Sequence, residues 1–297
     1  MNKRILVISD MHIPFHHKDS LTFLEEIKKE YKPDCIINIG DLLDFHAINM
    51  HTHDPDLYSA GHELRASRGF IRALEGIFPK MVEVESNHSS LVYRRALKYG
   101  MSREFLKDYG EFLGTKKWKW VDDLTLTMSN GQKCFFTHGR SADISKVSQA
   151  MGMSAVQGHY HTKFVISYWA NPDNIFFSMN VGCLIDKNHL AFKYSRVIVK
   201  RPILSVVAAR KDATVAISKQ SPFAAPGHSP SLLYGYFEDM DRGTTTWSLK
   251  ARKSKPPASA ARAIAPRPAP VPPGPRAMII KPNFMQGTSG STNCQAI

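Results

Sequence analysis

The hydrophobic pattern at the start of the chain alternates between two kinds of segment. Short runs of aliphatic and β-branched residues at 4–9 and 35–39 are typical of buried strands. Between them, residues 21–31 repeat Leu, Phe and Ile at helical spacing, with Glu and Lys on the other side. Residues 61–78 have a helical pattern as well, and residues 81–85 form a third strand-like run. This strand–helix–strand order predicts an α/β fold with crossover helices.

The following part of the chain is richer in strand-like runs. The sequence contains no internal repeat with a fixed period. We expect helices at 91–113 and 142–151, and strands at 133–137, 163–169, 175–181 and 190–199.

Side chains that can bind metal ions follow these strands directly. Asp10 and His12 are two residues apart on extended backbone, so both point to the same side. In open α/β sheets, binding sites form outside the carboxyl ends of the strands, which is where these residues fall. In chain order, the candidate residues are Asp10, His12, Asp41, Asp44, Asn87, His88, His138, His159 and His161.

The donor atoms of this set are oxygens and imidazole nitrogens. Without a thiolate, they favour Mn²⁺, Fe or Zn²⁺ over an iron–sulfur cluster or a structural cysteine–zinc site. The four cysteines lie far apart with no C-x-x-C pair, so they indicate neither a disulfide framework nor a zinc knuckle. A carboxylate between two ions can bridge them, and two ions about 3.5–4 Å apart can promote in-line displacement at phosphorus.

Composition and charge divide the chain near residue 203. Of the net charge of +13, residues 1–200 carry +4, from 26 Lys and Arg against 22 Asp and Glu, and residues 201–297 carry +9, from 13 against 4. Nine of the 18 prolines lie between Pro256 and Pro282. We therefore expect a globular body at 1–203 and a basic, Pro/Ala/Arg-rich, largely disordered extension at 204–297, which could be a tether, a partner-binding arm or an added segment without function.

The chain lacks the features of a membrane or secreted protein. No apolar run approaches the ~18 residues that a membrane helix needs, and Asp10 interrupts the only apolar stretch near the amino terminus. We predict a cytoplasmic protein without a membrane partner, and the sequence indicates no particular oligomeric state.

In their order and spacing, the metal-binding residues resemble the calcineurin-like metallophosphoesterase family, in particular its stand-alone bacterial and phage members. The matching motifs are D-x-H at 10–12, G-D-x-x-D at 40–44, N-H at 87–88, a histidine at 138 after a strand, and G-H-x-H at 158–161. The resemblance implies a four-layer α/β/β/α sandwich, with two sheets face to face and helices outside.

The resemblance also implies a metal site and a mechanism. Two divalent ions, Mn²⁺ before Fe or Zn²⁺, would bind, with Asp41 as the bridge, and metal-bound hydroxide would attack phosphorus. His88 would act as general acid, oriented by Asp44. One ion would be held by Asp10, His12, Asp41 and His161, and the second by Asp41, Asn87, His138 and His159.

Three positions depart from the family pattern. Ser86 stands where the family has glycine before Asn-His, and Ser89 stands where it has an acidic residue. Loss of an outer carboxylate typically costs about 10–100-fold in metal affinity or activity. Phe45 stands where protein Ser/Thr phosphatases carry an arginine that clamps phosphate, which argues against a phosphoprotein phosphatase.

The predicted function is hydrolysis of a phosphodiester or phosphomonoester, with nucleic acid or a nucleotide as the leading substrate class. Arg140 could bind the substrate phosphate, and for Arg94 and Arg95 a solvated helix face competes with the same role. The alternative from another class is a metal-binding interaction protein with a weakened active site, which Ser86 and Ser89 suggest. Other histidines, His16, His17, His46, His51, His53 and His62, are interpreted as cleft-rim or surface residues.

Overall fold

The computed structural model describes residues 4–50, 54, 56–128, 130–192 and 202–210 of the chain, together with the backbone of three later strands. The Pro-rich part of the predicted extension, at 256–282, lies outside these residues.

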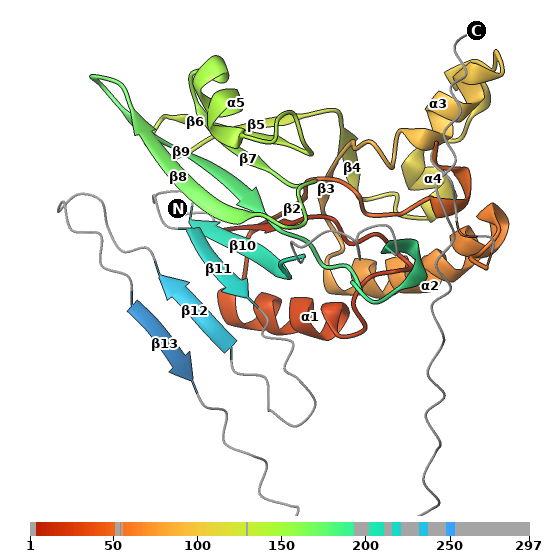
Figure 1. Cartoon of the computed structure of the whole chain (residues 1–297), viewed down its shortest axis with the longest axis horizontal. Helices are drawn as coiled ribbons and strands as arrows, with labels where there is room; N and C mark the ends of the chain where they lie inside the picture. Colours follow the sequence, from red (N-terminus) through yellow and green to blue (C-terminus); the bar gives the residue numbers. More distant parts are fainter. Residues whose placement is uncertain are drawn as a thin grey trace, which may run out of the picture. The chain divides into compact units, whose positions relative to one another are not determined.

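The first sheet is built on four parallel strands. In order across the sheet they are β1 (Arg4–Ile8), β2 (Cys35–Asn38), β3 (Val82–Val84) and β4 (Lys119–Val121). The first three match the strands expected from the sequence, and β4 was not predicted. Because the four strands run in parallel, their carboxyl ends lie at the same end of the sheet (Figure 1).

The same sheet continues on the other side of β1 with antiparallel strands. β10 (Ser205–Arg210) pairs with β1, and Val206 and Val207 are buried on its opposite faces. The sheet therefore extends beyond residue 203, where we expected the globular body to end. The remaining strands are β11 (Ala216–Gln220), β12 (Leu232–Tyr236) and β13 (Ser248–Arg252).

The second sheet contains five strands among the described residues. Their order is β5 (Leu124–Thr127), β6 (Lys133–Thr137), β7 (Ser154–Gln157), β9 (Ile175–Val181) and β8 (Phe164–Ala170). β6, β7 and β9 are parallel, while β5 and β8 are antiparallel edge strands. β6, β8 and β9 match the expected strands. β5 and β7, with four residues each, were not predicted.

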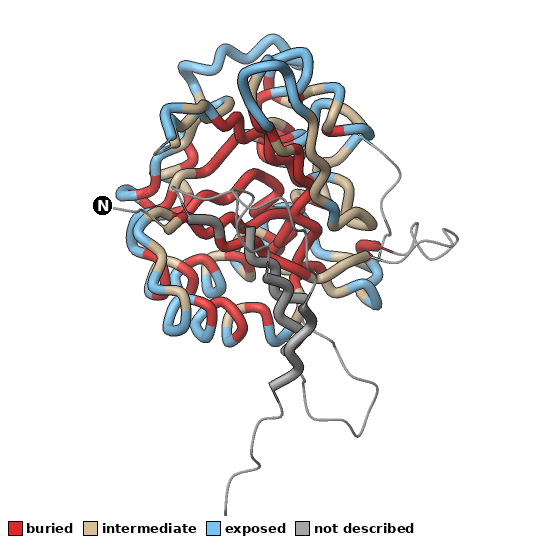
Figure 2. The backbone as a smooth tube through the Cα atoms, turned by 90° about the vertical axis from the view of Figure 1, so that its left-hand side faces the viewer, coloured by how far each residue is buried: buried red, intermediate tan, exposed pale blue. Residues whose placement is uncertain are grey.

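The two sheets face each other, and helices cover their outer sides. Side chains that alternate along β1 separate two cores: Ile5 and Val7 point into the core between the sheets, whereas Leu6 and Ile8 pack against helices. Those helices are α1 (Ser20–Tyr31) and α2 (Ala60–Ile77), and α5 (Ile144–Met151) covers the second sheet. The buried backbone is concentrated in the sheets and on the inner sides of the helices (Figure 2). The order of layers is α/β/β/α, as the resemblance implied.

The connection from β3 to β4 differs from the single helix expected at 91–113. It forms α3 (Leu91–Lys98), the short helix η2 (Arg103–Phe105) and α4 (Tyr109–Leu113). Gly100, with φ of +74°, ends α3, and Asp108 caps α4 by accepting a hydrogen bond of 2.7 Å from the Glu111 amide.

The prediction of a strand at 190–199 is wrong for its first three residues. Leu190, Ala191 and Phe192 form a helical turn, and residues 193–199 lie outside the described part. Ala191 and Phe192 are buried against Phe15, so packing rather than strand pairing explains their apolar character. Within the described residues, no helix has both the length and the apolar composition needed to cross a membrane.

Candidate metal centre

The candidate metal ligands lie in loops at the carboxyl ends of strands from both sheets. Asp10 follows β1, Asp41 follows β2, His138 follows β6, and the loop with His159 and His161 follows β7. Because the two sheets face each other, these loops meet at one end of the sandwich.

The backbone of these loops is held in an unusual conformation. Asp10, His12, Asp41 and His159 all have φ between +50° and +66°, in the left-handed region that non-glycine residues rarely adopt. Each such residue costs about 1–3 kcal/mol, and such residues cluster at functional sites. At Gly40, with φ of +101°, a Cβ atom would lie 2.6 Å from His138 Nδ1, so only glycine allows this approach.

A first cluster contains Asp10, His12, Asp41 and His161. Asp10 Oδ1 lies 3.0 Å from His161 Nε2, and His12 Nε2 lies 3.1 Å from His161 Nε2 and 3.4 Å from Asp41 Oδ2. One donor atom from each residue lies within 4.8 Å of the others. Asp10, His12 and Asp41 are buried, and His161 is half-buried, so this group could hold a metal ion.

A second cluster contains Asp41, His138 and His159. His138 Nε2 lies 3.1 Å from Asp41 Oδ2 and 3.1 Å from His159 Nδ1. The other ring nitrogen of His138 lies 2.9 Å from the Ile39 carbonyl, to which it can donate a hydrogen bond. Asp41 belongs to both clusters through the same carboxylate.

The fourth predicted ligand of the second ion, Asn87, lies in the turn after β3. It is exposed, and its carbonyl accepts a hydrogen bond of 3.2 Å from the Ser90 hydroxyl. Its role as a ligand stays a prediction.

Electrostatics differ between the two clusters. Burial alone would raise the pKa of Asp41, but the nearby His138 and His88 hold it well below its usual value. Burial likewise acts against the charge of His138, yet Asp41 raises the pKa of this histidine to about 9. Burial lowers the pKa of His12 despite its carboxylate neighbours. Without metal, therefore, His138 carries a proton at neutral pH and His12 does not.

The predicted general acid, His88, is held by Asp44, but through the main chain. His88 Nδ1 contacts the Asp44 carbonyl oxygen, and its Nε2 lies 4.0 Å from Asp41 Oδ2. The Asp44 carboxylate is 3.8 Å from His88 Nδ1 and only 2.7 Å from His12 Nδ1. Burial works against protonation of His88, but Asp41 and Asp44 raise its pKa above the usual value. Asp44 thus orients both His12 and His88, and its contact with His12 was not predicted from the sequence.

The loop that carries Asp44 has an anchor that sequence analysis missed. Glu63 on α2 accepts hydrogen bonds from the amides of His46 (3.0 Å) and Ala47 (3.1 Å). His46 is buried, with Nδ1 3.6 Å from Asp44, and His16 is buried as well. These two histidines are therefore not surface residues. The only sequence signal was the position of Glu63 in the first turn of a predicted helix.

Ser86 and Ser89, which depart from the family pattern, bind each other. The Ser86 amide donates to the Ser89 hydroxyl (2.7 Å), and the Ser89 amide donates to the Ser86 hydroxyl (3.1 Å). Tyr109 of α4 donates a further hydrogen bond of 2.6 Å to the Ser89 carbonyl. Reciprocal serine hydrogen bonds thus close the turn that carries Asn87 and His88.

The arginines that could bind substrate have different environments. Arg140 is exposed after β6, where it pairs with Asp123 and lies 3.3 Å from Thr137 Oγ1; its role in binding phosphate stays a prediction. Arg95 donates to the carbonyls of Ile48 (2.8 Å) and Asn49, so it holds the loop after Asp44.

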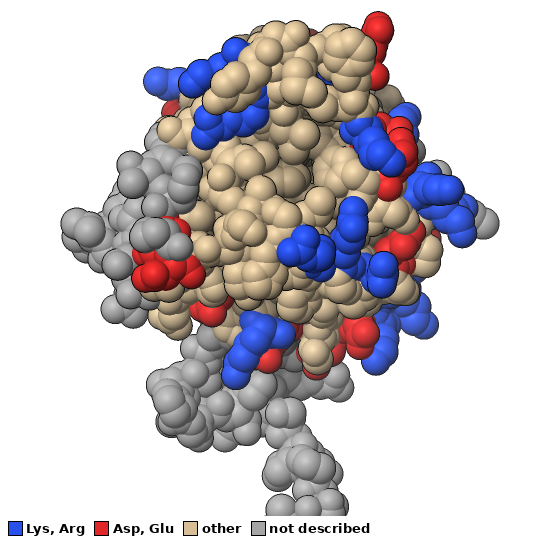
Figure 3. All heavy atoms as spheres, turned by 90° about the vertical axis from the view of Figure 1, so that its right-hand side faces the viewer, with Lys and Arg blue, Asp and Glu red and all other residues tan. Residues whose placement is uncertain are grey.

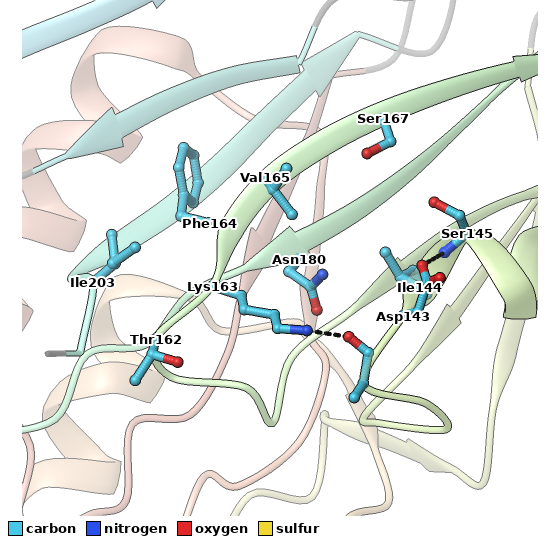
Figure 4. Close-up of a pocket in the computed structure, with 11 residues that line it drawn as sticks. Asp143, Ile144, Ser145, Thr162, Lys163, Phe164, Val165, Ser167, Asn180 and Ile203 are labelled. Atoms are coloured by element: carbon cyan, nitrogen blue, oxygen red, sulfur yellow. Dashed lines mark hydrogen bonds between the residues drawn. The ribbon is translucent and has the colours of Figure 1, made fainter. Parts of the chain in front are cut away.

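A pocket of about 390 Å³ opens beside the His161 loop, between the start of α5 and β8 (Figure 4). Lys163, two residues after His161, contacts the Ala142 carbonyl at its rim. Asn180, which lines the pocket and is almost completely buried, accepts a hydrogen bond of 3.0 Å from Gln157. The pocket gives space next to the loop that carries two candidate ligands.

Two phage proteins are similar to the chain. One is the "Gene 54 protein" of Mycobacterium phage D29, 24% identical over 209 residues that cover 63% of this chain and 81% of that protein. The other is the "Gene 54 protein" of Mycobacterium phage L5, 26% identical over 213 residues with the same coverage.

Among solved structures, Vps29 proteins are similar. Vacuolar Protein Sorting 29 from Cryptosporidium parvum is 12% identical with a TM-score of 0.37, over 85% of this chain and 99% of that chain. Vps29 from Entamoeba histolytica is 12% identical with a TM-score of 0.39, over 84% and 99%.

A comparison with protein families agrees with the motifs and the clustered donors. The family model described as "Calcineurin-like phosphoesterase" matches residues 3–179. This range includes both clusters and more than half of the chain, and the chain therefore belongs to the calcineurin-like phosphoesterase family.

Proposed function

We propose that the chain is a two-metal phosphoesterase that hydrolyses a phosphodiester or a phosphomonoester, with nucleic acid or a nucleotide as the substrate class. The observation that carries this proposal is the shared carboxylate of Asp41, whose Oδ2 lies 3.4 Å from His12 Nε2 in one cluster and 3.1 Å from His138 Nε2 in the other. An oxygen between imidazoles of two clusters is positioned so that the Asp41 carboxylate could bridge two ions.

The residues fit divalent ions by their chemistry. Two buried carboxylates lie beside imidazoles in a set without thiolates, which suits Mn²⁺, Fe or Zn²⁺. Two such ions would neutralise charge on the phosphate and supply a nucleophile by lowering the pKa of water. The first would be held by Asp10, His12, Asp41 and His161, and the second by Asp41, Asn87, His138 and His159.

The other polar groups orient these ligands. The Asp44 carboxylate, 2.7 Å from His12 Nδ1, accepts a hydrogen bond from the N–H at that nitrogen and leaves Nε2 free to face the centre. The Ile39 carbonyl does the same for His138. In the neutral ring, both hydrogen bonds favour the tautomer that a metal ligand needs, and for His138 the Nε2 proton must first be displaced.

His88 is proposed as the general acid. The Asp44 carbonyl accepts a hydrogen bond from the Nδ1–H group, so Nε2 is the nitrogen that faces the centre. The Nε2 proton would pass to the leaving oxygen as its bond to phosphorus breaks, and His88 would then regain a proton from solvent. With its side chain 22% exposed, His88 is open enough to exchange protons and to contact a substrate.

Hydrolysis of bis-p-nitrophenyl phosphate and p-nitrophenyl phosphate with Mn²⁺ tests the proposal. We expect turnover that EDTA removes and that His88→Ala lowers while two ions stay bound. The ratio of diester to monoester turnover identifies the substrate class. Two bound ions without turnover on either compound would favour the metal-binding interaction protein instead, and a chain that binds no ion would refute the ligand assignment.

A further inference from the structure

Apolar side chains that are strongly exposed gather at the end of α3 and in η2. Tyr99 and Phe105 are 74% and 77% exposed, and Leu97 and Met101 nearby are 60% and 45% exposed. These four residues lie within nine positions of the chain, on a helix end and a helical turn. Exposed apolar groups in one place mark interaction sites rather than ordinary surface.

The same segment is basic. Residues 94–107 contain five Lys and Arg and one Glu. Arg94, Lys98 and Arg103 are exposed, and the Arg103 guanidinium lies 4.2 Å from the Tyr93 ring centre, which ties η2 to α3. We call the four apolar residues and these three cations the α3–η2 surface. Figure 3 shows the side of the molecule on which α3 and α4 lie in Figure 1, with groups of Lys and Arg on a largely uncharged surface and Asp and Glu beside some of them.

Acidic groups offset only part of this charge, because Glu85 interacts with Arg103 but not with the other two cations. Glu111 is paired with Lys107, and the Asp108 side chain caps α4. Arg94 and Lys98 form no ion pair with the described residues. Within 94–105, Glu104 is the acidic residue that remains.

We infer that the α3–η2 surface binds single-stranded nucleic acid, with bases stacked on Tyr99 and Phe105 and phosphates against Arg94, Lys98 and Arg103. Aromatic side chains interleaved with cations are how proteins hold single strands without sequence preference. α3 begins three residues after His88, and its eight residues span about 12 Å, so a strand on this surface can reach the metal centre.

The charge argues against the other simple occupant, a second copy of this chain. In a symmetric dimer, the same basic surface would face itself, and like charges would repel. A polyanion has no such conflict. This inference rests on the proposed function in one respect: a bound strand is a substrate only if the metal centre hydrolyses phosphoesters. Binding of the strand can be measured without hydrolysis.

Fluorescence anisotropy with a labelled oligothymidylate of about 15 nucleotides, in EDTA, tests the inference. We expect the single strand to bind more tightly than a duplex and to weaken steeply between about 50 and 200 mM salt. Tyr99→Ala and Phe105→Ala should each weaken binding by about tenfold, because one stacked base is lost. Lys98→Gln should lower the salt slope by about 0.7, the value for one phosphate contact to a single strand.

Two variants serve as matched controls. Tyr99→Phe keeps the stacking ring and should bind like the unmodified chain, and Ile175→Ala removes an exposed apolar side chain (48% exposed) from β9 and should also bind normally. Since the replaced side chains are largely exposed, the variants should unfold at the same temperature.

Two results would overturn this inference. Unchanged binding in Tyr99→Ala and Phe105→Ala would overturn the inference, and so would a dimer in light scattering that Tyr99→Ala separates into monomers. A parallel assay of bis-p-nitrophenyl phosphate hydrolysis distinguishes failure of this inference from failure of the proposed function. Hydrolysis without oligonucleotide binding overturns this inference alone, and binding that depends on Tyr99 without hydrolysis overturns the proposed function alone.

Discussion

The two clusters at the metal centre share Asp41 but differ in almost every other respect. The first combines two buried carboxylates with His12 and His161. The second has one carboxylate, His138 and the less buried His159, and its fourth predicted ligand, Asn87, is exposed. Carboxylates attract cations strongly, so the first cluster should bind its ion more tightly. The second is closer to solvent, whereas His88 lies beside the shared Asp41 and beside His12 of the first cluster, with 4.7 Å between the two ring centres.

The largest effect should come from the residue that both clusters share. Asp41→Ala removes the bridge and leaves two incomplete sets of donors, so we expect hydrolysis to fall by about 10⁴-fold or more. Metal analysis should show fewer than two ions per chain. Asp173→Ala, which removes an exposed carboxylate in the β8–β9 turn, is the control. Two bound ions in Asp41→Ala would contradict a shared ligand.

A smaller loss is expected for His88, which lies beside both clusters. His88→Ala should lower kcat by about 10²–10⁴-fold and leave both ions bound, because a general acid is lost but no ligand. Metal analysis and kinetics on the same sample separate the two effects. His62→Ala, an exposed histidine of α2, should have unchanged kcat. If His88→Ala loses an ion, His88 is a ligand and its role must be reassigned.

The protonation of His138 distinguishes the clusters without any mutation. Its pKa is raised to about 9, while an unfolded histidine titrates near 6.5. The folded metal-free protein keeps this proton to higher pH, so the contribution of His138 to stability is fully present below pH 6.5 and is lost as the pH rises to about 9, by up to about 3 kcal/mol. Denaturant unfolding in EDTA at a series of pH values measures this.

Metal should change that pH profile. Binding at the second cluster must displace the His138 proton, whereas His12 in the first cluster has none to lose at neutral pH. Calorimetry in buffers of different ionisation enthalpy should therefore detect about one proton released with the weaker ion near pH 7.5. Equal proton release for both ions would contradict the difference in electrostatics.

Asn87→Ala should affect the second cluster only. Loss of one neutral ligand should weaken the second ion by about 10–100-fold and leave the first unchanged, so the first ion is an internal control. A metal titration followed by calorimetry measures both affinities. An unchanged second affinity would exclude Asn87 from the ligands.

The smallest effect is expected from the serine pair. Ser89→Ala loses the 2.7 Å hydrogen bond to the Ser86 amide and should cost about 1 kcal/mol of stability and less than tenfold in kcat. Ser59→Ala, before α2, removes a serine whose side chain makes no capping hydrogen bond and should change neither. A loss above a hundredfold would show that the pair does more than close the turn.

Much of the fold was predictable because its signals are local. The strands β1, β2, β3, β6, β8 and β9 and the helices α1, α2 and α5 each have a continuous apolar or amphipathic pattern. β4 (Lys-Trp-Val) and β7 (Ser-Ala-Val-Gln) each have only two apolar residues beside polar ones, so no continuous apolar run marks them. β10 was assigned to the extension because the charge and proline content of the last third concealed its apolar run, Val206 to Ala209.

The sequence alone determined which residues could bind metal, since Asp10, His12, Asp41 and the histidines of the later motifs occur directly after apolar runs that form strands. Only the tertiary structure decided which of them meet. His12 and His161 are 149 positions apart, yet their Nε2 atoms lie 3.1 Å apart because the two sheets pack face to face with those strand ends together. The tertiary structure also places the Asp44 carboxylate against His12 rather than His88. That contact depends on the path of the loop after Asp44, which Glu63 of α2 and Arg95 of α3 hold by hydrogen bonds.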